Sequence, residues 1–124
     1  MAKNILIIDD EELVTQSLKL LLKKEGYNTE IAKSGKEALE KIKGADFNLI
    51  ISDVRMPGLD GIETIKRIRA YLEKKGKSPV PEVLITGYAD MEKYVIAKEL
   101  EASDYLYKPF DNNEFLRIIK KAIR

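Results

Sequence analysis

Polar side chains that could do chemistry stand directly after four separate apolar runs of the chain. They are Asp9 and Asp10, Asp53, Thr86, and Lys108. The runs are rich in β-branched residues and are bounded by turn residues, a pattern typical of buried parallel strands. Because ligands of open α/β sheets bind outside the carboxyl ends of the strands, we expect these side chains to meet at one edge of a sheet.

The chemistry that these groups suit is phosphoryl transfer onto a carboxylate. Asp9, Asp10 and Asp53 would repel one another unless a hard divalent cation lay among them, and Mg²⁺ is usually held by one or two carboxylates together with water and phosphate oxygens. Lys108 adds a fixed positive charge for the transferring phosphoryl group. Asp is a known phosphoryl acceptor, so Asp53 is the candidate nucleophile, and Thr86 could donate its hydroxyl to a phosphoryl oxygen.

Simpler structural roles compete with this interpretation of the acidic residues. Asp9 and Asp10 could cap the helix that follows them, because Asp is favoured at helix N-termini. Glu11 and Glu12 crowd more negative charge there than one cap needs, which favours a cation. Asp53 could be a turn residue, but its position after an all-apolar run favours the functional role.

The other candidates have equally simple alternatives. Thr86 could be a β-branched strand residue, although Gly87 beside it leaves room for a ligand. Lys108 could be a surface lysine, yet Pro109 imposes a defined turn that would fix where the ammonium group points. Tyr105 is more often a core residue than a switch, and the residues alone do not decide between the two.

Strands and helices alternate along the whole chain and predict an α/β fold. We expect strands at about 4–8, 28–32, 48–52, 82–86 and 104–107 and helices at about 11–25, 35–43, 62–74, 91–100 and 111–123. Right-handed crossovers then give a doubly wound, five-stranded parallel sheet of flavodoxin-like order 2-1-3-4-5. Residues 73–81 form the longest polar connection, which we expect to be a solvated loop.

Composition narrows the setting of the protein. The 124 residues are enough for one domain spanning 1–124, and 22 Lys and Arg against 21 Asp and Glu leave a formal net charge of +1. This balance does not predict direct nucleic-acid binding or attraction to an anionic membrane. The chain has no Cys and no His, so the site must work with oxygen ligands. No apolar run is long enough to span a membrane, and we expect a cytoplasmic protein.

Four segments together resemble the response-regulator receiver domains of two-component signalling, and the similarity extends over residues 3–124. The segments are IIDDE at 7–11, SDVRMPGLDG at 52–61, ITG at 85–87 and DYLYKPF at 104–110. The resemblance implies that Asp53 accepts the phosphoryl group and that Asp10 binds Mg²⁺ directly, with Asp9 acting mainly through a metal-bound water. The backbone carbonyl of Arg55 would be a further ligand.

The resemblance also implies a signalling role rather than an enzyme. A sensor histidine kinase or phosphotransfer protein would supply the phosphoryl group, and Thr86 and Tyr105 would report phosphorylation as a coupled pair. The readout would be the surface of residues 91–123, with Lys93, Tyr94, Lys98 and Tyr107 as exposed candidates. That surface would contact a downstream target or output domain, and phosphorylation could lead to a dimer.

Further expectations concern local geometry and the lifetime of the phosphorylated state. The resemblance implies a cis peptide bond before Pro109. Receiver domains usually have Gly where this chain has Glu101, so this residue either adopts a positive φ or ends the preceding helix differently. Arg55 and Tyr88 are placed to block an attacking water, which predicts slow self-dephosphorylation.

Two alternatives of other classes remain open on sequence alone. A Mg²⁺-dependent phosphohydrolase on a related sheet would also use a nucleophilic Asp, but it generally needs a second carboxylate two residues later, where this chain has Arg55. The second alternative is a receiver-like interaction module that no longer takes phosphate. The complete set of polar residues at the strand ends argues against it.

Overall fold

The computed structural model describes residues 2–55, 60–87 and 98–124 of the protein. Its five strands are all parallel and lie in the order β2-β1-β3-β4-β5, which confirms the predicted topology. The strands are β1 (Asn4–Ile8), β2 (Asn28–Ala32), β3 (Leu49–Asp53), β4 (Glu82–Gly87) and β5 (Asp104–Lys108). The described helices are α1 (Glu12–Lys24), α2 (Gly35–Gly44), α3 (Gly61–Lys74) and α5 (Asn112–Ala122).

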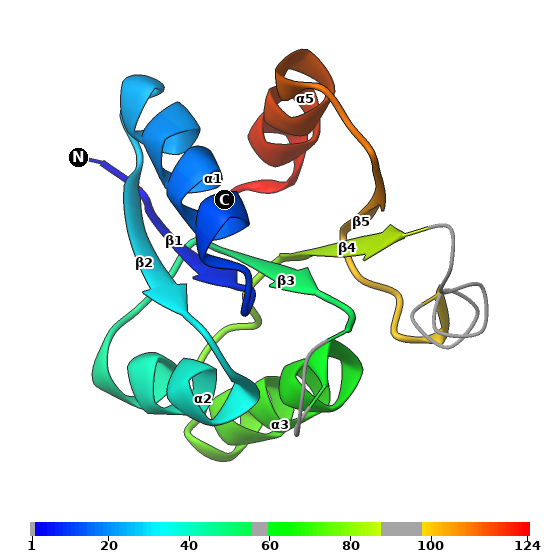
Figure 1. The fold of residues 1–124 in the computed structure, drawn as a ribbon. Coiled ribbons are helices and arrows are strands. Elements are labelled where there is room, and N and C mark those ends of the chain that lie inside the picture. Colours follow the sequence, from blue (N-terminus) through cyan, green and yellow to red (C-terminus); the bar gives the residue numbers. More distant parts are fainter. Residues whose placement is uncertain (1, 56–59, 88–97) are drawn as a thin grey trace.

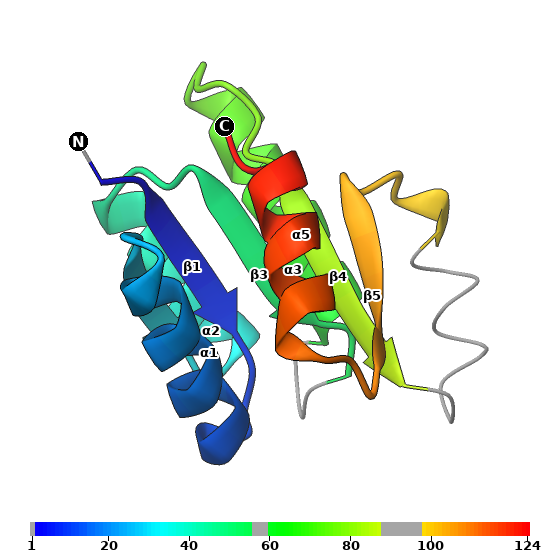
Figure 2. The same cartoon turned by 90° about the horizontal axis from the view of Figure 1, so that it is seen from above.

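Helices cover both faces of the sheet, with α1 and α5 on one face and α2 and α3 on the other (Figures 1 and 2). Alternate residues of one strand enter opposite cores because successive strand side chains point to opposite faces. In β1, Leu6 and Ile8 belong to the core under α2 and α3, whereas Ile5 and Ile7 belong to the core under α1 and α5. This double burial explains why the inner strands β1, β3 and β4 appear in the sequence as nearly continuous apolar runs.

Three of the four described helices begin with a side-chain cap. Ser34, Asp60 and Asp111 each accept a hydrogen bond from the backbone N–H three residues later, at 3.1, 2.8 and 2.7 Å. The residue at that later position is Glu in all three helices, which matches the capping-box pattern and places a carboxylate near the positive end of each helix. The caps define the first residues of α2, α3 and α5, and all four described helices begin within one residue of the predicted positions.

The structure refines several element boundaries. Strands β3, β4 and β5 each extend one residue beyond the predicted end, because pairing continues to Asp53 with Ile85 and to Gly87 with Lys108. Residues 91–97 of the predicted fourth helix lie outside the described residues, and 98–99 are helical.

The polar connection between α3 and β4 is solvated for most of its length. Residues 75–79 are exposed, as expected. Val80, in contrast, packs against the core under α2 and α3, so the end of this connection is anchored rather than free.

Candidate phosphoacceptor and cation site

The carboxyl ends of the strands bring Asp53 and Lys108 together, although they are 55 positions apart in sequence. Lys108 is the last residue of β5 and donates a hydrogen bond from Nζ to Asp53 Oδ2 at 2.8 Å. The backbone N–H of Arg55 donates to Asp53 Oδ1 at 2.9 Å. Asp53 is buried, and hydrogen bonds to both of its oxygens fix how the carboxylate is presented.

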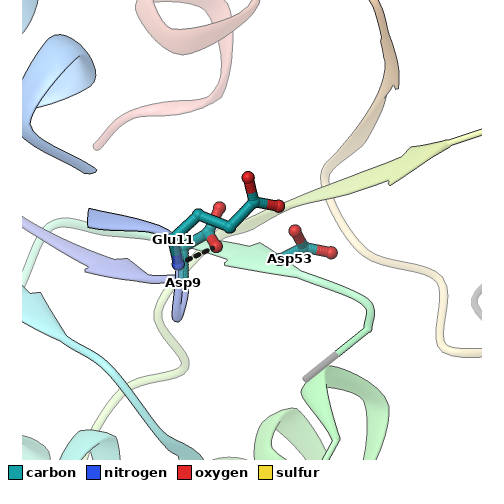
Figure 3. A group of neighbouring side chains, drawn as sticks. All are labelled: Asp9, Glu11 and Asp53. Atoms are coloured by element: carbon teal, nitrogen blue, oxygen red, sulfur yellow. Dashed lines mark hydrogen bonds between the residues drawn. The ribbon is translucent and has the colours of Figure 1, made fainter. Parts of the chain in front are cut away.

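Three carboxylates converge at this edge of the sheet, namely those of Asp9, Glu11 and Asp53. Each contributes an oxygen that lies within 4.8 Å of the other two (Figure 3). Asp10, which the resemblance implies as a direct cation ligand, is exposed and is not part of this group. The structure thus places Glu11 beside Asp9 and Asp53, a position that the sequence suggested only as local crowding of charge.

The helix-capping alternative for Asp9 and Asp10 does not fit the observed geometry. The N-cap residue of α1 is Glu11, and its side chain makes no capping hydrogen bond. Asp9 Oδ1 accepts the backbone N–H of Glu11 at 3.0 Å, a contact just before the helix (Figure 3). The second oxygen of Asp9 is therefore available for another role.

Two buried side-chain oxygens in the described part of the chain have no hydrogen-bond partner. They are Asp9 Oδ2 and Thr86 Oγ1, and each residue is only 2% exposed. An unpaired buried polar group is costly and points to a missing partner. The Asp9 carboxylate oxygen suits a hard cation such as Mg²⁺, and the Thr86 hydroxyl suits an anionic oxygen.

Burial and neighbouring charges perturb the ionisation of the site. Burial, reinforced by the charge of Asp53, raises the pKa of Asp9 from 3.8 to about 6, although the Glu11 N–H and the charge of Lys108 oppose this. Burial alone would lower the pKa of Lys108, but its hydrogen bond to Asp53 and the surrounding carboxylates raise it overall. Lys108 therefore stays cationic, while burial favours the protonated form of Asp9.

Gly61, the first residue of α3, lies against the backbone of Asp53. Its N–H donates to the carbonyl of Val54 at 3.0 Å, and a Cβ at this position would overlap the carbonyl oxygen of Asp53. Only glycine fits here without a shift of the backbone that carries the phosphoacceptor candidate. In the sequence this position stands out only as the last residue of the segment 52–61, because the close approach of α3 to β3 is a tertiary contact.

Tyr105 lies on β5, apart from the carboxylate group. Its hydroxyl accepts the N–H of Ala102 at 3.0 Å and donates to the carbonyl of Lys98 at 3.4 Å. The ammonium of Lys98 lies 4.9 Å from the centre of the Tyr105 ring. Tyr105 therefore connects β5 to residues 98–102.

The remaining local expectations have mixed outcomes. Glu101 has φ of 54°, so the chain adopts the left-handed turn without glycine. The Lys108–Pro109 peptide bond is cis, as the resemblance implied. Tyr107 is 40% exposed. Tyr88, Lys93 and Tyr94 lie outside the described residues.

The fold is a doubly wound α/β sheet of order 2-1-3-4-5 with a carboxylate, a lysine and a threonine at its carboxyl edge, and comparison with known proteins identifies the family. Residues 5–120 match the family model for the response regulator receiver domain. The chain belongs to this family.

Named relatives agree with this assignment. The chain is 38% identical over 121 residues to the transcriptional regulatory protein FixJ of Bradyrhizobium diazoefficiens, covering 98% of this chain and 57% of that protein. It is 37% identical over 120 residues to ZraR of Escherichia coli K12, covering 97% of this chain and 26% of that protein. The chain thus spans about half or less of the length of these two relatives.

A solved structure covers nearly the same length. The chemotaxis protein CheY4 of Vibrio cholerae superposes with a TM-score of 0.86 at 32% identity, over 98% of this chain and 99% of that one. Among the described residues of the present protein, no helix is long and apolar enough to cross a membrane.

Proposed function

We propose that residues 1–124 form one receiver domain that acts in the cytoplasm as a phosphoacceptor switch, taking a phosphoryl group from a phosphohistidine onto Asp53 with the help of Mg²⁺. The observation that carries this proposal is the pair of buried, unpartnered oxygens, Asp9 Oδ2 and Thr86 Oγ1, at the edge where Asp53 and Lys108 meet. The Asp9 oxygen suits a cation as its partner, and the Thr86 hydroxyl suits an anionic oxygen.

The acidic residues would hold the cation. Asp9, Asp10, Asp53 and the backbone carbonyl of Arg55 are the proposed ligands, with Asp10 turning in from its exposed position. Mg²⁺, when bound, supplies positive charge that offsets the carboxylates and the incoming phosphoryl oxygens. The orphaned oxygen of buried Asp9 supports this fit.

Asp53 is the proposed nucleophile. Lys108 contacts Asp53 Oδ2 and would hold a phosphoryl oxygen by a charge-assisted hydrogen bond once the phosphoryl group is attached. Thr86 would donate its hydroxyl to another phosphoryl oxygen, which satisfies its missing contact.

The output would follow from the movement of Thr86. Tyr105 would change its packing in response, giving up its hydrogen bonds to the backbone of Lys98 and Ala102. This change would alter the surface of residues 91–123 that a downstream target, an output domain or a second copy of the chain recognises.

The phosphodonor partner would dock on α1. Leu13 is 85% exposed and Leu20 is 62% exposed, and they lie seven residues apart, about two turns of one helix face. Because α1 begins one residue after Glu11, a helix packed on this face would bring its phosphohistidine near Asp53. Changing Leu13 to Ser should slow transfer from the cognate kinase and leave labelling by a small phosphodonor unchanged. Equal slowing with both donors would contradict this docking face.

Intact-mass measurement after incubation with Mg²⁺ and acetyl phosphate tests the function. We expect one phosphoryl group per chain, lost when EDTA is present during the reaction and absent in Asp53→Asn. Asp46→Asn is the matched control, because Asp46 is an exposed surface carboxylate. Retained labelling of Asp53→Asn would refute the assignment, and release of inorganic phosphate over many turnovers without accumulation would favour a phosphohydrolase.

A further inference from the structure

Glu11 lies at the solvent side of the candidate site, where the proposed function gives it no role. Its side chain is 62% exposed, and Oε1 lies 3.8 Å from Lys108 Nζ. Figure 3 shows this side chain extending past Asp9 toward the side of Asp53. A small molecule approaching Asp53 from solvent would therefore meet the Glu11 carboxylate.

The position of Glu11 matters because of the charged side chains around it. Asp9, Glu11 and Asp53 lie close together, and the ammonium of Lys108 contacts two of them, Asp53 and Glu11. Lys108 is shared unequally, since its Nζ is 2.8 Å from Asp53 Oδ2 and 3.8 Å from Glu11 Oε1. Glu11 therefore competes with the phosphoryl oxygens for the ammonium of Lys108. It also repels anions that approach Asp53 from solvent.

We propose that Glu11 is a specificity-determining residue that selects phosphodonors by their charge. Its carboxylate disfavours donors of high negative charge, such as acyl phosphates, relative to donors whose leaving group is protonated and cationic, such as a phosphorylated imidazole. This inference rests on the proposed phosphoacceptor function of Asp53.

Two small donors separate the charge effect from the chemistry. With acetyl phosphate, a carboxylate oxygen of Asp53 bonds to phosphorus as the bond from phosphorus to the acetyl oxygen breaks, and acetate leaves with the electron pair. With phosphoramidate, the same attack breaks the phosphorus–nitrogen bond, and ammonia leaves with the protons that its nitrogen already carried. Near neutral pH phosphoramidate carries one negative charge fewer than acetyl phosphate.

The test compares Glu11→Gln with Glu12→Gln, which removes the same charge one residue further on. Glu12 is exposed, lies outside the carboxylate group and has Lys33 as its ion-pair partner at 4.0 Å. Labelling rates of Asp53 are measured for both donors at saturating Mg²⁺, in low and high salt. Saturation is set for each variant by calorimetric titration with Mg²⁺ alone.

One unit charge at about 5 Å in water changes a rate by about fourfold for each unit of donor charge. Glu11→Gln should therefore raise the rate with acetyl phosphate about fourfold more than the rate with phosphoramidate. High salt should shrink this difference. Calorimetry should show weaker Mg²⁺ binding by Glu11→Gln than by the parent, since a nearby negative charge is lost.

An unchanged ratio between the two donors, or the same change in Glu12→Gln, would overturn the role of Glu11. Either result leaves the phosphoacceptor function intact as long as the parent protein is labelled on Asp53. Failure of the parent to be labelled would instead contradict the proposed function.

Discussion

Replacing Asp9 by Asn should stabilise the cation-free protein at neutral pH. Asp9 is 2% exposed and has one oxygen without a partner. Burial, the largest cause, raises its pKa from 3.8 to about 6, so folding disfavours the ionised form of this carboxyl. Asn has nearly the same shape and carries no charge, and it should therefore remove this cost.

The size and pH dependence of the effect follow from the pKa shift. Between pH 3.8 and about 6 the folded protein keeps a proton on Asp9 that the unfolded chain has already lost. The stability linked to this proton is fully present below pH 3.8 and is lost as the pH rises through 6. Because the pKa is raised by about 2 units, the ionised form of Asp9 lowers the unfolding free energy by about 3 kcal/mol at neutral pH. Near pH 5 this cost is about half as large.

Urea unfolding followed by circular dichroism measures the effect. Asp9→Asn should exceed the parent in unfolding free energy by up to about 3 kcal/mol near neutral pH and by about half as much near pH 5. Mg²⁺ should narrow the difference, because it would stabilise the folded parent more than the variant. Asp46→Asn, which removes an exposed carboxylate paired with Lys77 at 3.2 Å, should not raise the unfolding free energy. A variant less stable than the parent at neutral pH, or a gap independent of pH, would refute the reasoning.

Three other predictions follow from single residues. Gly61→Ala should lower the unfolding free energy by roughly 1–3 kcal/mol, because its Cβ would overlap the backbone of Asp53; wild-type urea stability would contradict this. Glu101→Gly should raise stability by about 0.5–1 kcal/mol in the same assay, since φ of 54° strains Glu and suits Gly; a loss of stability would count against strain at this turn. Arg55→Asn and Tyr88→Ala should each speed loss of phosphate from labelled protein in Mg²⁺, and unchanged lifetimes in both variants would exclude a shielding role.

The sequence predicted the sheet and the meeting of Asp53 and Lys108 at one of its edges, because both depend on simple patterns. Apolar runs buried on two faces define the inner strands β1, β3 and β4. Polar residues that follow parallel strands, such as Asp53 and Lys108, are then expected to meet at one edge of the sheet. The strand limits moved by one residue because β pairing continues through these polar positions, which hydropathy does not show.

Other features depended on tertiary geometry and could not be read from the chain. The approach of Glu11 to Asp53 depends on how the turn after β1 directs its side chain. The tight contact at Gly61 depends on the packing of α3 against β3. For Glu101 the sequence left open whether its φ would be positive or the preceding helix would end differently. The positive φ occurs together with a hydrogen bond from the N–H of Ala102 to the hydroxyl of Tyr105.

Peptide mapping of the phosphorylated protein tests most directly whether Asp53 is the cation-dependent acceptor. Protein labelled with acetyl phosphate in Mg²⁺ is reduced with borohydride, which converts an aspartyl phosphate to homoserine, and is then digested and sequenced by tandem mass spectrometry. We predict homoserine at position 53 alone, and none when Mg²⁺ is chelated during labelling. Homoserine at another position, or equal conversion of Asp53 without Mg²⁺, would contradict the proposed site.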